Sequence, residues 1–138
     1  MPWDLERRPP KRFYFDKDQL EWVDLRLVDD DEKQEIRERL GIKLNEMVYV
    51  PNPAKDNQLE LVPGKISGEQ IAAFMRELNF AGIPAWNLVA KGGTEIPHTI
   101  ENVDLMIRKS RRFAAFVKRG WEQLVKDELA EAEEERKN

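Results

Sequence analysis

The sequence predicts an α+β fold, in which a small antiparallel sheet of two hairpins is packed by a capped helix and followed by a long C-terminal amphipathic helical segment. Before residue 63, short segments with alternating polarity occur in two pairs, which is typical of hairpins. A helix-start signal follows at residue 67, and helical spacing of apolar residues dominates after residue 99. We expect an α+β body with an N-terminal arm at 1–98 and a helical segment at 99–138, forming a single domain overall.

Composition limits the class of protein. Of the 138 residues, 36% are charged and 41% are hydrophobic, which favours a folded domain with a strongly solvated surface. The formal net charge of -4 argues against a dedicated nucleic-acid binder. The absence of cysteine excludes disulfides, thiolate metal ligands and cysteine nucleophiles. Because no signal peptide or membrane-spanning stretch is recognisable, we expect a cytoplasmic protein.

The first part of the chain predicts an arm and a hairpin. Pro9 and Pro10 prevent regular strand pairing, so residues 1–10 are expected to form the arm. Apolar residues then alternate with polar ones in 13–15 and 22–28, and the residues between these segments are polar. This pattern predicts two strands joined by a turn.

A short helix and a second hairpin are expected next. The acidic run 29–32 suits the positive end of a helix dipole, and Gly41 suits a left-handed cap at the other end. Residues 47–50 and 59–62 read as strands separated by a proline-containing loop. Since isolated two-stranded hairpins are marginal in water, we expect this hairpin to extend the first sheet.

A capped helix is predicted at about 68–80. Ser67 and Gln70 have the spacing of a capping box, and apolar residues at helical steps mark one face. The apolar cluster in 83–89 is interpreted as a turn or a short helix, and Gly92-Gly93 as a tight turn.

The C-terminal third predicts one long helix or one kinked helix, with Thr99 as its cap. Ser110 interrupts the apolar stripe and marks the expected junction. We expect 100–109 to belong to the body, 113–129 to project as an arm, and the acidic tail 130–138 to fray. The stripe consists of Ile100, Val103, Met106, Ile107, Ala114, Val117, Trp121, Leu124 and Val125.

Residues with the chemistry of an active site are few. His98 lies at a helix start, and no nucleophile motif accompanies it, so we interpret it as a structural residue. The acidic run 29–32 lacks the spacing of a calcium loop, and Gly92-Gly93 lacks the lysine of a phosphate-binding loop. The sequence therefore predicts no enzyme, no catalytic residue, no metal site and no cofactor.

The strongest candidate site is the basic middle of the C-terminal segment, where cations and aromatic residues interleave. One interpretation is contact with a client or with another copy of the chain, whose acidic tail would complement the cations. A second is nucleic-acid binding through the cations of 108–119. A third is that the aromatic residues pack inside the protein and the cations are simply solvated. The candidate residues are Phe113, Phe116, Val117, Trp121, Leu124, Arg108, Arg111, Arg112, Lys118 and Arg119.

Several segments together resemble one known family. They are the strand sequence Trp22-Val23-Asp24-Leu25-Arg26, Trp86 after an Ile-Pro turn, the segment 93–103, the helix start at Met106-Ile107, Ser110 with Phe113, and the closing Lys137-Asn138. In layout the chain resembles the tail assembly chaperones of long-tailed (siphovirus-type) bacteriophages and prophages, small proteins thought to coat the tape measure protein while the tail tube assembles. The match covers nearly the whole chain, although none of its motifs is diagnostic.

The resemblance implies a non-enzymatic protein that binds the tape measure protein and forms homo-oligomers on it. It also implies a location in the cytoplasm of the bacterial host and absence from the mature virion. In this family a reading-frame slip commonly yields a longer form, and that form is expected to contact the tail tube protein. The ending Arg-Lys-Asn is one that an adenine-rich slippery site can encode. The alternative function is a nucleic-acid-associated phage or bacterial accessory protein.

Overall fold

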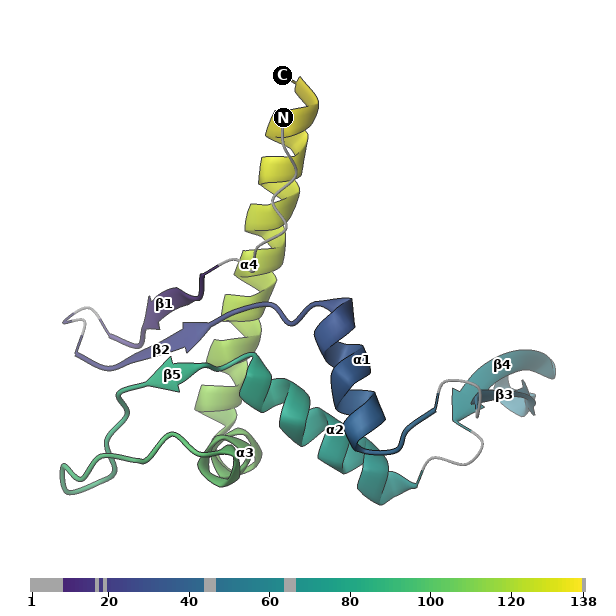
Figure 1. Cartoon of the computed structure of the whole chain (residues 1–138), viewed down its shortest axis with the longest axis horizontal. Coiled ribbons are helices and arrows are strands. Elements are labelled where there is room, and N and C mark those ends of the chain that lie inside the picture. Colours follow the sequence, from purple (N-terminus) through teal and green to yellow (C-terminus); the bar gives the residue numbers. More distant parts are fainter. Residues whose placement is uncertain (1–8, 17, 19, 44–46, 64–66, 138) are drawn as a thin grey trace. The chain divides into compact units, whose positions relative to one another are not determined.

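The described residues of the computed structural model are 9–137, except 17, 19, 44–46 and 64–66. They confirm the α+β class, with two small antiparallel sheets and a long C-terminal helix (Figure 1). The chain divides into two compact units. One consists of Met1–Val28 with Asn79–Asn138, and the other of Asp29–Leu78.

The first unit contains a three-stranded antiparallel sheet in the order β1-β2-β5. Strand β1 (Lys11–Tyr14) pairs with β2 (Trp22–Leu25), as the alternating pattern predicts. The third strand, β5 (Ala85–Trp86), pairs with β2 through Val23 opposite Trp86. The interpretation of this segment as a turn or short helix is therefore wrong, because its strand conformation comes from pairing with β2 and not from a pattern of its own.

The second hairpin forms a separate two-stranded sheet in the other unit. Strand β3 (Met47–Asn52) pairs with β4 (Gln58–Pro63), and the loop between them contains the 3₁₀ turn η2 (Pro53–Lys55). The hairpin itself confirms the prediction, but the expectation that it extends the first sheet is wrong. The position beside β2 is taken by β5.

Helix α1 (Asp30–Arg39) shows both of its predicted end signals. The Asp29 carboxylate accepts a hydrogen bond from the backbone N–H of Glu32 at 2.7 Å, which satisfies a donor of the first turn. Gly41 has φ of 71°, a left-handed conformation that favours glycine. Ile36 is the buried apolar residue of α1.

Helix α2 (Gly68–Ala81) begins with the predicted capping box. The backbone N–H of Gln70 donates to Ser67 Oγ at 3.1 Å, and Gln70 Oε1 accepts from the Ser67 N–H at 3.1 Å. Within the second unit, Arg39 of α1 and Glu77 of α2 form an ion pair at 3.6 Å. The end of α2 belongs to the first unit.

The C-terminal segment is two helices, α3 (Ile100–Lys109) and α4 (Arg111–Lys137). Thr99 caps α3 as predicted, by accepting from a backbone N–H of the first turn. Ser110 has extended backbone, with φ of -115° and ψ of 105°, and its Oγ accepts from the Phe113 N–H at 3.1 Å. The side chain of Ser110 therefore caps α4 at the junction where the helix direction changes (Figure 1).

The core of the first unit lies between the sheet, the segment after α2, and the two C-terminal helices. Partly buried side chains from β1, α3 and α4 pack around it. Its buried residues are Val23, Leu25, Ile83, Trp86, Leu88, Val103, Phe113 and Val117.

The projecting part of α4 begins later than expected. Phe113 and Val117 are each only 2% exposed, and Leu124 still packs against the core, so the prediction that the whole of 113–129 projects is wrong. Beyond Leu124 the helix continues to Lys137, and residues 130–137 are helical and exposed. The expected fraying is not seen in this part.

Candidate partner-binding surface of the C-terminal helix

One row of residues on α4 faces the core. Phe113, Val117, Gly120 and Leu124 follow one another at steps of four, three and four, which places them on one side of a helix. The first three are buried and Leu124 is half-buried against the core. Beyond Leu124, the residues at the same helical spacing are acidic: Glu128, Glu131 and Glu135.

Gly120 lets α4 approach the sheet closely. A Cβ atom at this position would overlap Leu25 Cδ1, and Leu25 is fully buried in β2. Any larger residue would therefore have to displace Leu25 or lift the helix. The position of α4 on the sheet depends on this missing side chain.

Trp121 attaches α4 to the turn after α2. Its indole Nε1 donates to the carbonyl oxygen of Gly82 at 3.1 Å. Gly82 has no side chain, and a Cβ there would lie only 3.0 Å from the indole ring. Trp121 is thus held by the chain's own backbone.

The two aromatic residues of the basic region also pack within the first unit. The Phe116 ring stacks on Phe15, with centroids 3.9 Å apart, and Phe113 meets Trp86 edge to face at 5.8 Å. These contacts correspond to the third interpretation of the candidate residues, internal packing. Phe113 and Phe116 are not free to stack on a base or to bind a client.

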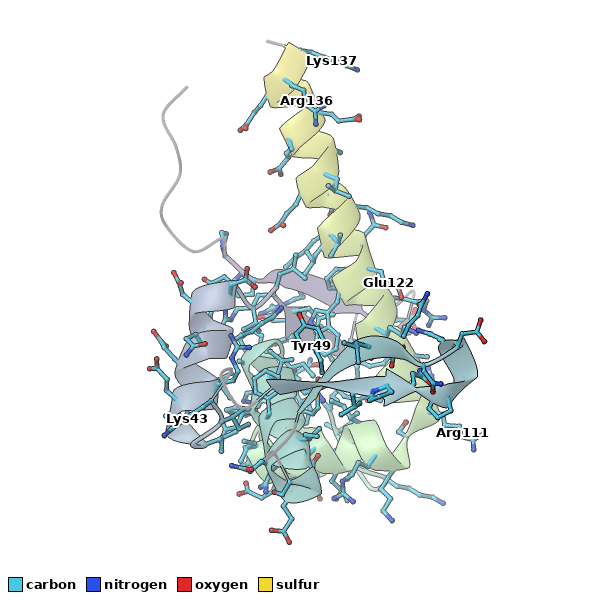
Figure 2. The ribbon with its side chains drawn as sticks, turned by 90° about the vertical axis from the view of Figure 1, so that its right-hand side faces the viewer. Lys43, Tyr49, Arg111, Glu122, Arg136 and Lys137 are labelled. Carbon is cyan, nitrogen blue, oxygen red and sulfur yellow. The ribbon has the colours of Figure 1, made fainter. Side chains whose placement is uncertain are left out.

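The cations of the candidate site point to solvent. Arg108 is on α3 and forms an ion pair with Asp104 at 3.0 Å. The other four are exposed residues of the first half of α4, and Arg111 projects from its base (Figure 2). They are Arg111, Arg112, Lys118 and Arg119.

The outer half of α4 exposes apolar residues. Val125 is 45% exposed and Leu129 is 63% exposed, and both follow Trp121 at four-residue steps. On another side of the helix, Asp127 lies 3.5 Å from Lys11 of β1. The pKa of Asp127 is below its ordinary value because Gln123 donates a hydrogen bond to the carboxylate and because the charge and hydrogen bond of Lys11 also favour the ionised form.

The ten predicted residues therefore do not form one surface. The apolar ones turn inward, whereas the cations turn outward. Val125 was predicted only as part of the stripe, and Leu129 was not predicted as a site residue. Their spacing from Trp121 was visible in the sequence, but the sequence could not show where the core ends along the helix.

His98 has a structural environment. Its Nε2 donates to the carbonyl oxygen of Ile83 at 2.6 Å, and its ring stacks on Phe80 at 5.0 Å. Within the part of the chain that the structure describes, no group of three or more His, Asp or Glu side chains has the arrangement of a metal site. No helix in that part is long and apolar enough to cross a membrane.

Comparison with known protein families, curated proteins and solved structures finds no match.

Proposed function

We propose that this chain is a non-enzymatic phage tail assembly chaperone, which binds the tape measure protein and further copies of itself during tail assembly. The observation that supports this most is the outer half of α4, a helix that leaves its own core while still presenting Val125 and Leu129 to solvent. A partner helix with an apolar stripe could cover these residues. The resemblance in sequence layout supplies the identity of the client.

The contacts of α4 with its own unit support a binding helix that is already formed before the client binds. Gly120 and Trp121 fix α4 to the sheet and to the turn at Gly82, so the exposed half extends from an anchored base. A preformed helix loses less conformational entropy on binding than a disordered segment does. Less of the contact energy with the client is therefore offset by ordering the helix, and more of it contributes to affinity.

The remaining parts of the proposal come from the family resemblance. They are a location in the cytoplasm of the bacterial host, absence from the mature virion, and a longer frameshifted form that contacts the tail tube protein. A nucleotide sequence without a slippery heptamer at the codons of Lys137 and Asn138 would remove the support for the longer form.

Co-expression with the large helical protein encoded downstream tests the proposal. We expect the two proteins to co-purify, and we expect Leu129→Asp to reduce the recovered complex at least tenfold, because it places a charge in the apolar contact. Leu105→Asp is the matched control, since Leu105 is a 45% exposed leucine on α3, outside the outer half of α4. It should leave the yield of complex unchanged.

Trp121→Asp is a poorer test, because Trp121 is bonded to Gly82 and its loss would weaken the fold. If both proteins are soluble and do not co-purify, the chaperone proposal is wrong. The proposal is also wrong if the Leu129→Asp and Leu105→Asp variants bind the client equally well.

The second candidate function is nucleic-acid binding, which the exposure of Arg111, Arg112, Lys118 and Arg119 favours. Since Phe113 and Phe116 pack internally, only phosphate contacts are left for it. Binding of this kind would weaken steeply with salt and would show no preference for base sequence. A DNA titration at two salt concentrations distinguishes it from the chaperone proposal.

A further inference from the structure

The hairpin of β3 and β4 is a two-stranded sheet with open edges. Among the residues that the structure describes, no further strand pairs with β3 or β4. None of the side chains in 49–60 is buried, so no other element covers this part of the hairpin. A sheet of only two strands is marginally stable in water unless a third strand or a helix packs on it. The hairpin therefore has both room for another strand and something to gain from one.

The register of the hairpin shows which backbone groups face outward. Antiparallel pairs alternate between pairs that exchange hydrogen bonds and pairs that do not. Pro51 has no N–H group to exchange, and it lies opposite Leu59, so this pair is of the second kind. Tyr49 and Leu61 form the next pair of that kind. The N–H and C=O groups of Leu59 and Leu61 thus point away from β3, toward the outer edge of β4.

One face of the hairpin is apolar and exposed. Tyr49, Pro51 and Leu59 share this face, because side chains alternate between the two faces and Pro51 lies opposite Leu59. Tyr49 is 67% exposed and Leu59 is 65% exposed (Figure 2). On the other face, β4 carries Glu60, whose carboxylate is in an ion pair within the hairpin. Along β4, an exposed apolar residue is therefore followed by a charged one, whereas β3 has apolar residues at 49–51 without interruption.

The unit that contains the hairpin carries the net charge of the whole chain. Asp29–Leu78 has eleven acidic and seven basic residues, whereas the rest of the chain has sixteen of each. The unit therefore accounts for the full charge of -4. A basic partner would be attracted to this unit, and an acidic one would be repelled.

We propose that the outer edge of β4 binds an extended, basic segment of a partner protein, which adds to the hairpin as a third strand. The outward N–H and C=O groups of Leu59 and Leu61 supply two donors and two acceptors for the new ladder. Apolar side chains of the partner lie beside Leu59 on the exposed face, and its basic side chains lie on the face of Glu60. The partner strand thus alternates between apolar and basic residues.

This site is separate from the one proposed on α4. The hairpin belongs to the unit Asp29–Leu78, whereas α4 belongs to the other unit. The strand site is recognised by backbone hydrogen bonds to a sheet edge, and the α4 site by the packing of apolar side chains. The inference therefore does not depend on the chaperone proposal.

A peptide titration of the full chain tests the site, with a capped seven-residue peptide of alternating lysine and valine as the probe. We expect binding with a Kd below about 1 mM, and we expect the N–H groups of Leu59 and Leu61 to become protected from hydrogen exchange by NMR. The same peptide with proline in place of its central valine should bind at least tenfold more weakly, because it cannot complete the ladder. A peptide with glutamate in place of lysine should also bind more weakly.

Two substitutions of Leu59 separate the backbone contact from the side-chain contact. Leu59→Pro removes the outward N–H without removing a ladder bond of the hairpin, and we expect it to weaken peptide binding at least tenfold. Leu59→Ala keeps the N–H and removes only apolar area, so it should weaken binding less than Leu59→Pro does. A cross-strand Hα–Hα nuclear Overhauser effect between Tyr49 and Leu61 checks that the hairpin is intact in each variant.

Four results would overturn the proposal. They are no protection of Leu59 and Leu61 at about 1 mM peptide, equal effects of Leu59→Pro and Leu59→Ala, protection of the Tyr49 N–H in their place, and protection that grows with chain concentration without peptide. The third would assign the partner strand to β3, and the fourth would show that a second copy covers the edge. The assay contains no client, so its failure leaves the chaperone proposal standing, and failure of co-purification leaves this one standing.

Discussion

The carbonyl oxygen of Gly82 accepts two hydrogen bonds, one from the indole Nε1 of Trp121 at 3.1 Å and one from the backbone N–H of Arg26 at 3.1 Å. A single backbone group therefore joins the end of β2, the turn after α2 and the long helix α4. This junction fixes the first half of α4, beyond which the exposed outer half extends (Figure 1).

Trp121→Phe tests this junction. The variant loses the indole hydrogen bond and part of the ring that covers Gly82, while the Arg26 N–H still satisfies the carbonyl. We expect a decrease in the free energy of unfolding of about 1–2 kcal/mol, measured by urea denaturation. An unchanged unfolding midpoint would show that the bond to Gly82 does not support α4.

Gly120→Ala tests the close approach of α4 to the sheet. Overpacking a core costs about 1–3 kcal/mol, whereas replacing a helical glycine with alanine gains about 1 kcal/mol. Because the new methyl group would overlap the fully buried Leu25, we expect a net loss of up to about 2 kcal/mol. Gly68→Ala is the control, since nothing lies within 4 Å of its added Cβ, and it should not destabilise the protein. Equal unfolding free energies for the two variants would contradict this close packing of α4 on β2.

Ser110→Ala tests the junction between α3 and α4. The substitution removes the Oγ acceptor of the Phe113 N–H, so we expect a loss of about 1 kcal/mol in unfolding free energy. Ser110→Gly should cost only a few tenths of that value, about 0.3 kcal/mol, because glycine is a tolerated N-cap residue. If Ser110→Gly lowers the free energy of unfolding more than Ser110→Ala does, Ser110 does not stabilise the junction by capping α4.

The lowered pKa of Asp127 predicts that the stability of the folded protein decreases slightly in acid. Its folded pKa is lower than in the unfolded chain, so its contribution to stability is present above the unfolded value of about 3.8 and is lost as pH falls through the folded pKa. NMR titration of the carboxylate should show the lowered pKa. Gln123→Ala and Lys11→Ala should each raise this pKa, because the Gln123 hydrogen bond and the nearby Lys11 both lower it. A pKa that neither substitution changes would contradict that assignment.

Helix ends were predictable from the sequence because they depend on contacts within a few residues. The caps at Ser67 and Thr99 and the glycine at position 41 each act on backbone groups of the adjacent turn. The break at Ser110 was predictable for the same reason, since a polar residue interrupts the apolar stripe and can cap the next helix.

The sequence by itself determined the α+β class, the two hairpins, the helix ends and the division of charge on the C-terminal segment, because these depend on local spacing and short-range hydrogen bonds. Only the tertiary structure decided that Ala85–Trp86 is a strand, since two residues carry no alternation and pair with β2 through partners about 60 positions away. It also decided which side of α4 is buried and where burial ends. Phe116 packs on Phe15, which is remote in sequence, and Leu124 is the last residue of α4 that packs against the core.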